Sequence, residues 1–125
     1  LNMTSIGIDP FQATQMISGL LTQHAPVVEV RQTVPNLSEP MKLVQAMVLD
    51  RKPGAPRIVH DGNPVLAWCV SNVVCHLDRK DNVYPNKERP EYKIDGAVAL
   101  IIAMARWVAV APNPQHDPAT ICIVG

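Results

Sequence analysis

The feature that most constrains the fold is a strongly apolar segment, residues 97–110, directly after Lys93-Ile94-Asp95-Gly96. Apolar residues occupy almost every side of a helix drawn over residues 95–110, the pattern of a central helix covered on several sides. Asp95 falls at the N-cap or in the first turn, where free N–H groups and the helix dipole favour a carboxylate. Asp95 therefore either caps the helix or places a metal-binding carboxylate at its mouth.

Length and charge limit the class of protein. With 125 residues, 47% of them hydrophobic, the chain can build one modest core, so we expect one domain over residues 1–110 and a proline-containing tail over residues 111–125. Eleven basic and eleven acidic residues cancel, so nucleic acid would have to bind a local basic cluster. Such clusters occur at Arg79-Lys80 and around Lys87 and Lys93, although each also suits a solvated loop.

The cysteines and the apolar stretches favour a cytoplasmic protein. Three cysteines without CxxC spacing argue against a disulfide framework and a structural zinc site. The longest apolar stretch is interrupted by Asp95, Gly96 and Arg106 and is too short for a membrane span, and no secretory signal is present. Because the chain begins at Leu1 rather than at a methionine, we expect it to be part of a longer polypeptide.

The first third of the chain has the pattern of a βαβ unit. Residues 3–8 and 27–31 are β-compatible, and between them apolar residues recur at helical spacing and stop before Pro26. The two strands are therefore predicted to be parallel, with a right-handed crossover. Asp9 then lies at a strand-to-helix junction.

A second helix is predicted after residue 38. Ser38 is its expected cap, Pro40 falls in its first turn, and Gly54 lies beyond its end. The apolar stripe of this helix is expected to consist of Met41, Val44, Met47 and Val48.

A short helix and a hairpin complete the pattern before the apolar helix. Residues 57–60 suit a short buried strand or an extended segment, and Asn63-Pro64 suits the start of a helix ending near Asn72. That helix would carry Val65, Trp68 and Cys69 on one face, which places Trp68 in the core. Residues 73–77 and 83–84 are predicted to form a hairpin whose tip carries Arg79 and Lys80.

Few residues suit catalysis. The sequence contains no glycine-rich phosphate loop, HExxH pair or GxSxG elbow, which argues against an ATPase, a zinc protease and an α/β-hydrolase. Asp9 and Asp95 are the exception, because loops at the carboxyl ends of parallel strands line the functional crevice of α/β folds and a central helix can begin beside them. Paired hard oxygen ligands select Mg²⁺ or Mn²⁺. Turn formation and helix capping explain the same two residues without catalysis.

An ordered series of segments then resembles a known family. The series is Asp9-Pro10-Phe11-Gln12-Ala13, residues 60–68 (HDGNPVLAW), Ser71-Asn72-Val73, Pro85-Asn86-Lys87 and residues 93–99 (KIDGAVA). Together these segments, spread over residues 3–110, resemble the C-terminal nuclease domain of the terminase large subunits of tailed phages and prophages.

The resemblance implies a fold, an activity and a site. The fold would be α/β, a ribonuclease H-like mixed sheet flanked by helices, and the activity an endonuclease that cuts concatemeric double-stranded DNA with two Mg²⁺ or Mn²⁺ ions about 4 Å apart. Asp9 and Asp95 match catalytic metal ligands. Lys87 and Lys93, together with the basic pair Arg79 and Lys80, would bind DNA, and the segments near the site contribute His60, Asn63 and Asn72 as supporting residues.

One departure and two alternatives accompany this interpretation. The family has a further catalytic Asp on the first strand of its sheet, upstream of the residues present here, so the resemblance implies missing first strands and a weak or inactive isolated nuclease. The implied partners are DNA, an ATPase domain, the small terminase subunit and the portal protein, in the cytoplasm of a bacterial host and away from membranes. The alternatives are a non-cleaving module that binds DNA, portal or small subunit, and an unrelated ribonuclease H-like resolvase or integrase.

Overall fold

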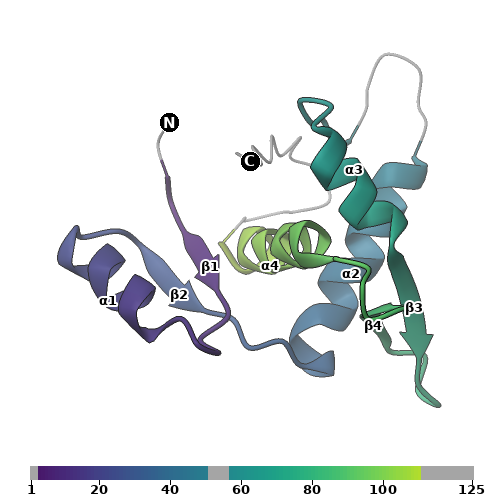
Figure 1. Ribbon diagram of the computed structural model, residues 1–125, viewed down its shortest axis with the longest axis horizontal. Helices are drawn as coiled ribbons and strands as arrows, with labels where there is room; N and C mark the ends of the chain where they lie inside the picture. Colours follow the sequence, from purple (N-terminus) through teal and green to yellow (C-terminus); the bar gives the residue numbers. More distant parts are fainter. Residues whose placement is uncertain (1–2, 51–56, 111–125) are drawn as a thin grey trace.

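Figure 1 shows the computed structural model, which describes residues 3–50 and 57–110. Four helices and two two-stranded sheets occur in these residues, which confirms the mixed α/β class. In chain order the elements are β1 (Ile6–Ile8), α1 (Thr14–Thr22), β2 (Val27–Glu29), α2 (Val34–Leu49), α3 (Pro64–Ser71), β3 (Val73–Leu77), β4 (Val83–Lys87) and α4 (Asp95–Val110). Gly54 and the tail over residues 111–125 lie outside the described residues.

The N-terminal elements form the predicted βαβ arrangement. β1 and β2 pair in parallel, with Ile6 opposite Val27 and Ile8 opposite Glu29. α1 connects them, as its apolar spacing predicts. However, α1 has no fully buried residue. Only one side of this helix is partly covered, so packing holds it loosely.

The predicted start of α2 is wrong. Thr33, with extended backbone, is the N-cap, and Pro35 lies in the first turn, where its fixed φ suits a helix start. Ser38 is therefore inside the helix and 3% exposed. Its hydroxyl accepts a 3.1 Å hydrogen bond from the backbone N–H of Val83 on β4. Pro40 is also in the helix interior rather than in its first turn.

α3 begins as predicted, but its exposed face differs from the prediction. The Asn63 side chain accepts hydrogen bonds from the N–H groups of Val65 and Leu66 at 2.9 and 3.3 Å, which confirms it as the N-cap. Cys69 is buried, whereas Trp68 is 47% exposed, so the core assignment of Trp68 is wrong. Consecutive helical residues point about 100° apart, and the side of α3 that packs on α4 includes Cys69 but leaves the indole outside.

The hairpin is confirmed and is longer than predicted. β3 and β4 pair antiparallel from Leu77 opposite Val83 to Val73 opposite Lys87. The tip carries Arg79 and Lys80, and Tyr84 packs partly buried against the core. By contrast, residues 57–60 form no strand, and their side chains are half-buried or exposed.

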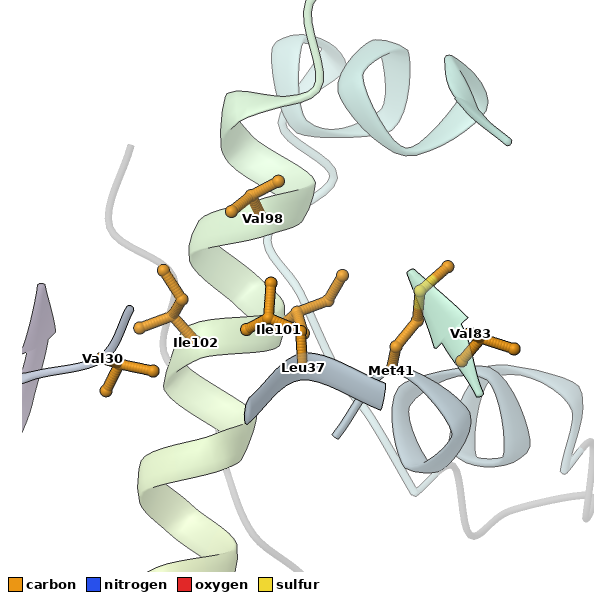
Figure 2. Close-up of a cluster of buried hydrophobic side chains, with 7 residues drawn as sticks. All are labelled: Val30, Leu37, Met41, Val83, Val98, Ile101 and Ile102. Carbon is orange, nitrogen blue, oxygen red and sulfur yellow. The ribbon is translucent and has the colours of Figure 1, made fainter. Parts of the chain in front are cut away.

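α4 spans the predicted residues and is the centre of the molecule (Figure 1). Figure 2 shows the core cluster at its surface, where Ile102 lies beside Val30 and Ile101 beside Leu37. The remaining members of this cluster are Met41, Val83 and Val98. The β1–β2 pair packs against α4, while β4 packs against α2. Within the described residues the strands thus form two separate sheets rather than one mixed sheet, because α2 and α4 pack between them.

None of the helices in the described ranges has the length and apolarity needed to cross a membrane.

Candidate functional site

An open cleft of about 680 Å³ lies where β1 ends and α4 begins. Asp9 directly follows β1 and Asp95 is the first residue of α4, and both line this cleft. Asp9 is half-buried and Asp95 is exposed. The wall between them is apolar and includes Ile8, Val98 and Ile102. The fold therefore brings a carboxylate that follows β1 and a carboxylate that begins α4 to the same open cleft.

Hydrogen bonds orient the Asp9 carboxylate. Its Oδ2 accepts a 2.7 Å hydrogen bond from Nε2 of Gln32, and its Oδ1 accepts a longer one, 3.4 Å, from the N–H of Phe11. The carbonyl of Gln32 in turn accepts from the hydroxyl of Tyr84 at 3.1 Å. Asp9 is thus linked through Gln32 to the β3–β4 hairpin.

Contacts from α3 and the residue after it hold the start of α4, and with it Asp95. Nδ2 of Asn72 donates to the carbonyl of Lys93 at 3.1 Å. At Gly96 an added Cβ would lie 3.4 Å from Cβ and Sγ of Cys69, so the first turn of α4 rests on α3. The N–H groups of this first turn, which have no partner within the helix, lie at the same end of α4 as Asp95.

The other predicted site residues lie around the cleft or away from it. Lys93 is exposed two residues before Asp95, and Nζ of Lys87 donates to the carbonyl of Pro90 at 3.2 Å in the loop before α4. Nδ1 of His60 accepts from the N–H of Gly62 at 3.0 Å in the loop before α3. Seven predicted site residues do not line the cleft: His60, Asn63, Asn72, Arg79, Lys80, Lys87 and Lys93.

Gln32 and Phe11 line the cleft and were missed as site residues by sequence reasoning. Gln32 follows β2 by three residues, and the carboxyl ends of parallel β1 and β2 meet at one edge. That rule, which singled out Asp9, could also have selected Gln32. Phe11 carries no such signal, since apolar residues near a helix start are usually read as core.

The donor set is compatible with a small divalent cation. Within residues 3–50 and 57–110, no three or more His, Cys, Asp or Glu side chains gather as a metal-binding group. Mg²⁺ commonly keeps several waters and is held by one or two carboxylates together with substrate phosphates. Asp9 and Asp95 line one open cleft, and carboxylate oxygens are the type of ligand that Mg²⁺ and Mn²⁺ take.

Comparison with known proteins identifies the family. Residues 1–111 match a family model described as the endonuclease domain of the terminase large subunit. Protein YmfN of Escherichia coli strain K12 is 43% identical over 101 residues, which are 79% of this chain but 21% of YmfN, so the chain spans about a fifth of that relative's length. No solved structure matches significantly. Because the family match extends over most of the sequence, this chain belongs to the endonuclease domain family of terminase large subunits.

Proposed function

We propose that this chain is a metal-dependent DNA endonuclease domain whose active site is the cleft between Asp9 and Asp95. The observation that carries the proposal is that two carboxylates, one from a strand end and one from a helix start, line the same open cleft. The family supports a nuclease role in phage DNA packaging. The assignment of the two residues, and of Mg²⁺ or Mn²⁺, is our own.

The chemistry follows from the chain's own groups. Asp9 and Asp95 would hold the divalent cations, which supply positive charge at the phosphate and lower the pKa of water so that it can attack at neutral pH. Gln32 holds the Asp9 carboxylate in one orientation through its 2.7 Å hydrogen bond. Lys93, exposed beside the cleft, attracts the DNA backbone, and Lys87 borders the same loop.

The rest of the proposal concerns the whole protein. We place residues 1–110 in a ribonuclease H-like nuclease domain followed by a tail, with concatemeric double-stranded DNA as substrate. Arg79 and Lys80 at the hairpin tip would add a second DNA contact, and His60, Asn63 and Asn72 would support the loops around the site. The ATPase domain, the small terminase subunit and the portal protein are the expected partners, in the cytoplasm of a bacterial host. Because two carboxylates bind Mg²⁺ weakly, we expect little cleavage by the isolated chain.

Metal binding is the first test. Paramagnetic Mn²⁺ should broaden the NMR signals of amides around the cleft, and Asp9→Asn or Asp95→Asn should each weaken this binding by about tenfold or more, since even outer-shell changes typically have effects of that size. The matched control is Asp81→Asn at the exposed hairpin tip, where the backbone φ of +58° suits Asn. Equal Mn²⁺ affinity in all three variants would remove the catalytic assignment.

Cleavage is the second test. Supercoiled plasmid is incubated with Mn²⁺ and with the chain, its Asp95→Ala variant, or a version extended upstream. We expect the extended version to cut more strongly than the chain. Asp95→Ala, introduced into each of the two, should abolish cleavage. If no version cuts or binds Mn²⁺, the chain is instead a module that binds DNA or packaging proteins.

A further inference from the structure

Phe11 is the only phenylalanine of the chain, and its side chain is 76% exposed at the edge of the cleft. It also lines a second cavity of about 570 Å³, together with Asp9, Gln32, Pro10, Arg31 and Thr33. The two cavities share Asp9, Phe11 and Gln32, so they adjoin. A solvent-exposed aromatic ring contributes little to the stability of the fold, so we ask what else this ring could contact.

The backbone holds Phe11 in this exposed position. The N–H of Ala13 donates to the carbonyl of Pro10 at 3.2 Å, which closes a turn with Phe11 at its second residue. The third residue, Gln12, has φ +56°, a conformation that non-glycine residues seldom adopt. The N–H of Phe11 itself points to the Asp9 carboxylate. The ring is therefore displayed on a turn that is tied to the proposed active site.

Arg31, a basic residue, also lines the second cavity. Its backbone is fixed, since its carbonyl accepts from Nδ2 of Asn36 at 2.9 Å and from the N–H of Thr33 at 2.8 Å. Its side chain is exposed, and within the described residues its guanidinium forms no ion pair. An aromatic residue and a basic residue thus line one cavity together with Asp9.

We propose that Phe11 and Arg31 form a subsite for one nucleotide of a locally unpaired DNA strand, the ring stacking on the base and the guanidinium binding the adjacent phosphate. Every base has a π face, so the stacking tolerates any sequence, and the planar fork of Arg suits phosphate oxygens. In a duplex the faces of a base are covered by its neighbours, so the subsite selects an unstacked base. Its place next to the cut rests on the proposed nuclease function.

Binding in the absence of metal tests the subsite separately from catalysis. Fluorescence anisotropy with a labelled oligothymidine, in EDTA, should show that Phe11→Ala weakens single-strand binding roughly 5- to 150-fold, the range for loss of one base stack. The same substitution should weaken the binding of a duplex of equal length by a smaller factor. Phe11→Trp should retain binding. Leu21→Ala, which removes another exposed apolar side chain, on α1, is the matched control and should change nothing.

Salt dependence distinguishes the two contacts. Arg31→Gln should reduce the slope of log affinity against log salt by about 0.7, the value for one phosphate contact to a single strand. Phe11→Ala should lower the affinity and leave that slope unchanged, because stacking releases no counterions. Oligothymidine should also quench the indole introduced by Phe11→Trp, measured as the difference from the wild-type chain with its Trp68 and Trp107.

Three results would overturn the subsite: no oligothymidine binding by the wild-type chain, unchanged binding in Phe11→Ala, or an equal loss in Leu21→Ala. If Asp95→Asn abolishes Mn²⁺ binding and cleavage while Phe11→Ala binds normally, the nuclease function stands and the subsite falls. Conversely, if Phe11-dependent binding is seen while neither the chain nor its upstream-extended version binds Mn²⁺ or cuts, the subsite is supported and the nuclease function is refuted.

Discussion

At Gly7, β1 lies close against α4. A Cβ added there would lie 2.6 Å from Cγ2 of Ile102 and 3.0 Å from Cγ of Arg106, distances that require the strand or the helix to move. Gly7→Ala should therefore destabilise the fold by about 1–3 kcal/mol, the usual cost of overpacking. Gly19, in α1, has no atom within 4 Å of its added Cβ. Gly19→Ala should stabilise the fold by about 0.5–1 kcal/mol. Urea unfolding of both variants checks this, and changes of the same sign would contradict it.

The carboxylate of Asp78 illustrates a purely local electrostatic effect. Hydrogen bonds from the side chain and backbone of Asn82, at 2.8 and 3.0 Å, and from the N–H of Lys80 at 2.7 Å hold its pKa below the ordinary value of 3.8. Because the folded-state pKa is the lower one, this stabilisation is present above 3.8 and is lost as the pH falls through the folded value. Near neutral pH this contribution is fully present, so Asp78 should make the stability vary with pH only under acidic conditions.

NMR titration of the Asp78 carboxyl carbon measures the shift directly. Asn82→Ala removes the largest cause, so the pKa of Asp78 should rise toward 3.8 in that variant. Asp61 is an internal reference in the same spectra, since its carboxylate is untouched by the substitution. A pKa of Asp78 that is identical in the two chains would show that Asn82 has no part in it.

At the scale of the elements, one buried polar contact joins α2 to β4. The Ser38 hydroxyl is the partner of the Val83 N–H, which is the first backbone donor of β4 and lies in the core. Ser38→Ala leaves this buried donor unpaired and should lower the free energy of unfolding by about 1–3 kcal/mol. Ser71→Ala is the control, because the exposed Ser71 hydroxyl bonds only to a carbonyl of its own helix. Urea unfolding measures both variants, and an equal shift of the denaturation midpoint in Ser38→Ala and Ser71→Ala would contradict the role of Ser38.

Elements with strong local signals were predictable from the sequence, and contacts between elements were not. α3 and α4 begin at Asn63-Pro64 and Asp95, as their capping residues indicate. At α2 the serine suggested a cap, but its hydroxyl is used across the core by Val83, a choice that only tertiary packing makes. The core assignment of Trp68 was wrong for a related reason, since periodicity defines a helical face without showing what covers it.

The candidate site follows the same division. Asp9 and Asp95 were selected because strand ends and helix starts are local features, and the structure places both along one cleft. Gln32 orients Asp9 across a sequence separation that no local pattern spans. The exposure of Phe11 depends on the turn at Gln12, where a non-glycine residue takes positive φ, and sequence alone does not reveal such a turn.

At the scale of the whole molecule, α4 joins two halves that share no strand (Figure 1). α2, the hairpin and α4 form most of the core cluster, to which the βαβ unit and the residue after it add only Val30. Other contacts of the unit include the packing of β1, with Gly7, against α4, the hydrogen bond that Nε of Arg106 donates to Oγ of Ser5 at 2.9 Å, and the hydrogen bond from Tyr84 to Gln32. The proposed active site therefore spans a boundary between a well-packed half and a lightly packed one.

This asymmetry predicts that the βαβ unit opens before the rest of the molecule unfolds. α1 has no buried residue, whereas α4 has six, so opening the unit exposes little apolar surface. In native-state hydrogen exchange, amides of α1 should exchange at least about tenfold faster than those of α4 near Ile101, an opening free energy lower by about 1.4 kcal/mol. Gly7→Ala, which strains the docking of β1 on α4, should accelerate exchange in residues 6–29. Equal protection of α1 and α4 would instead mean that the two halves unfold together, and Asp9 would then be held as firmly as Asp95.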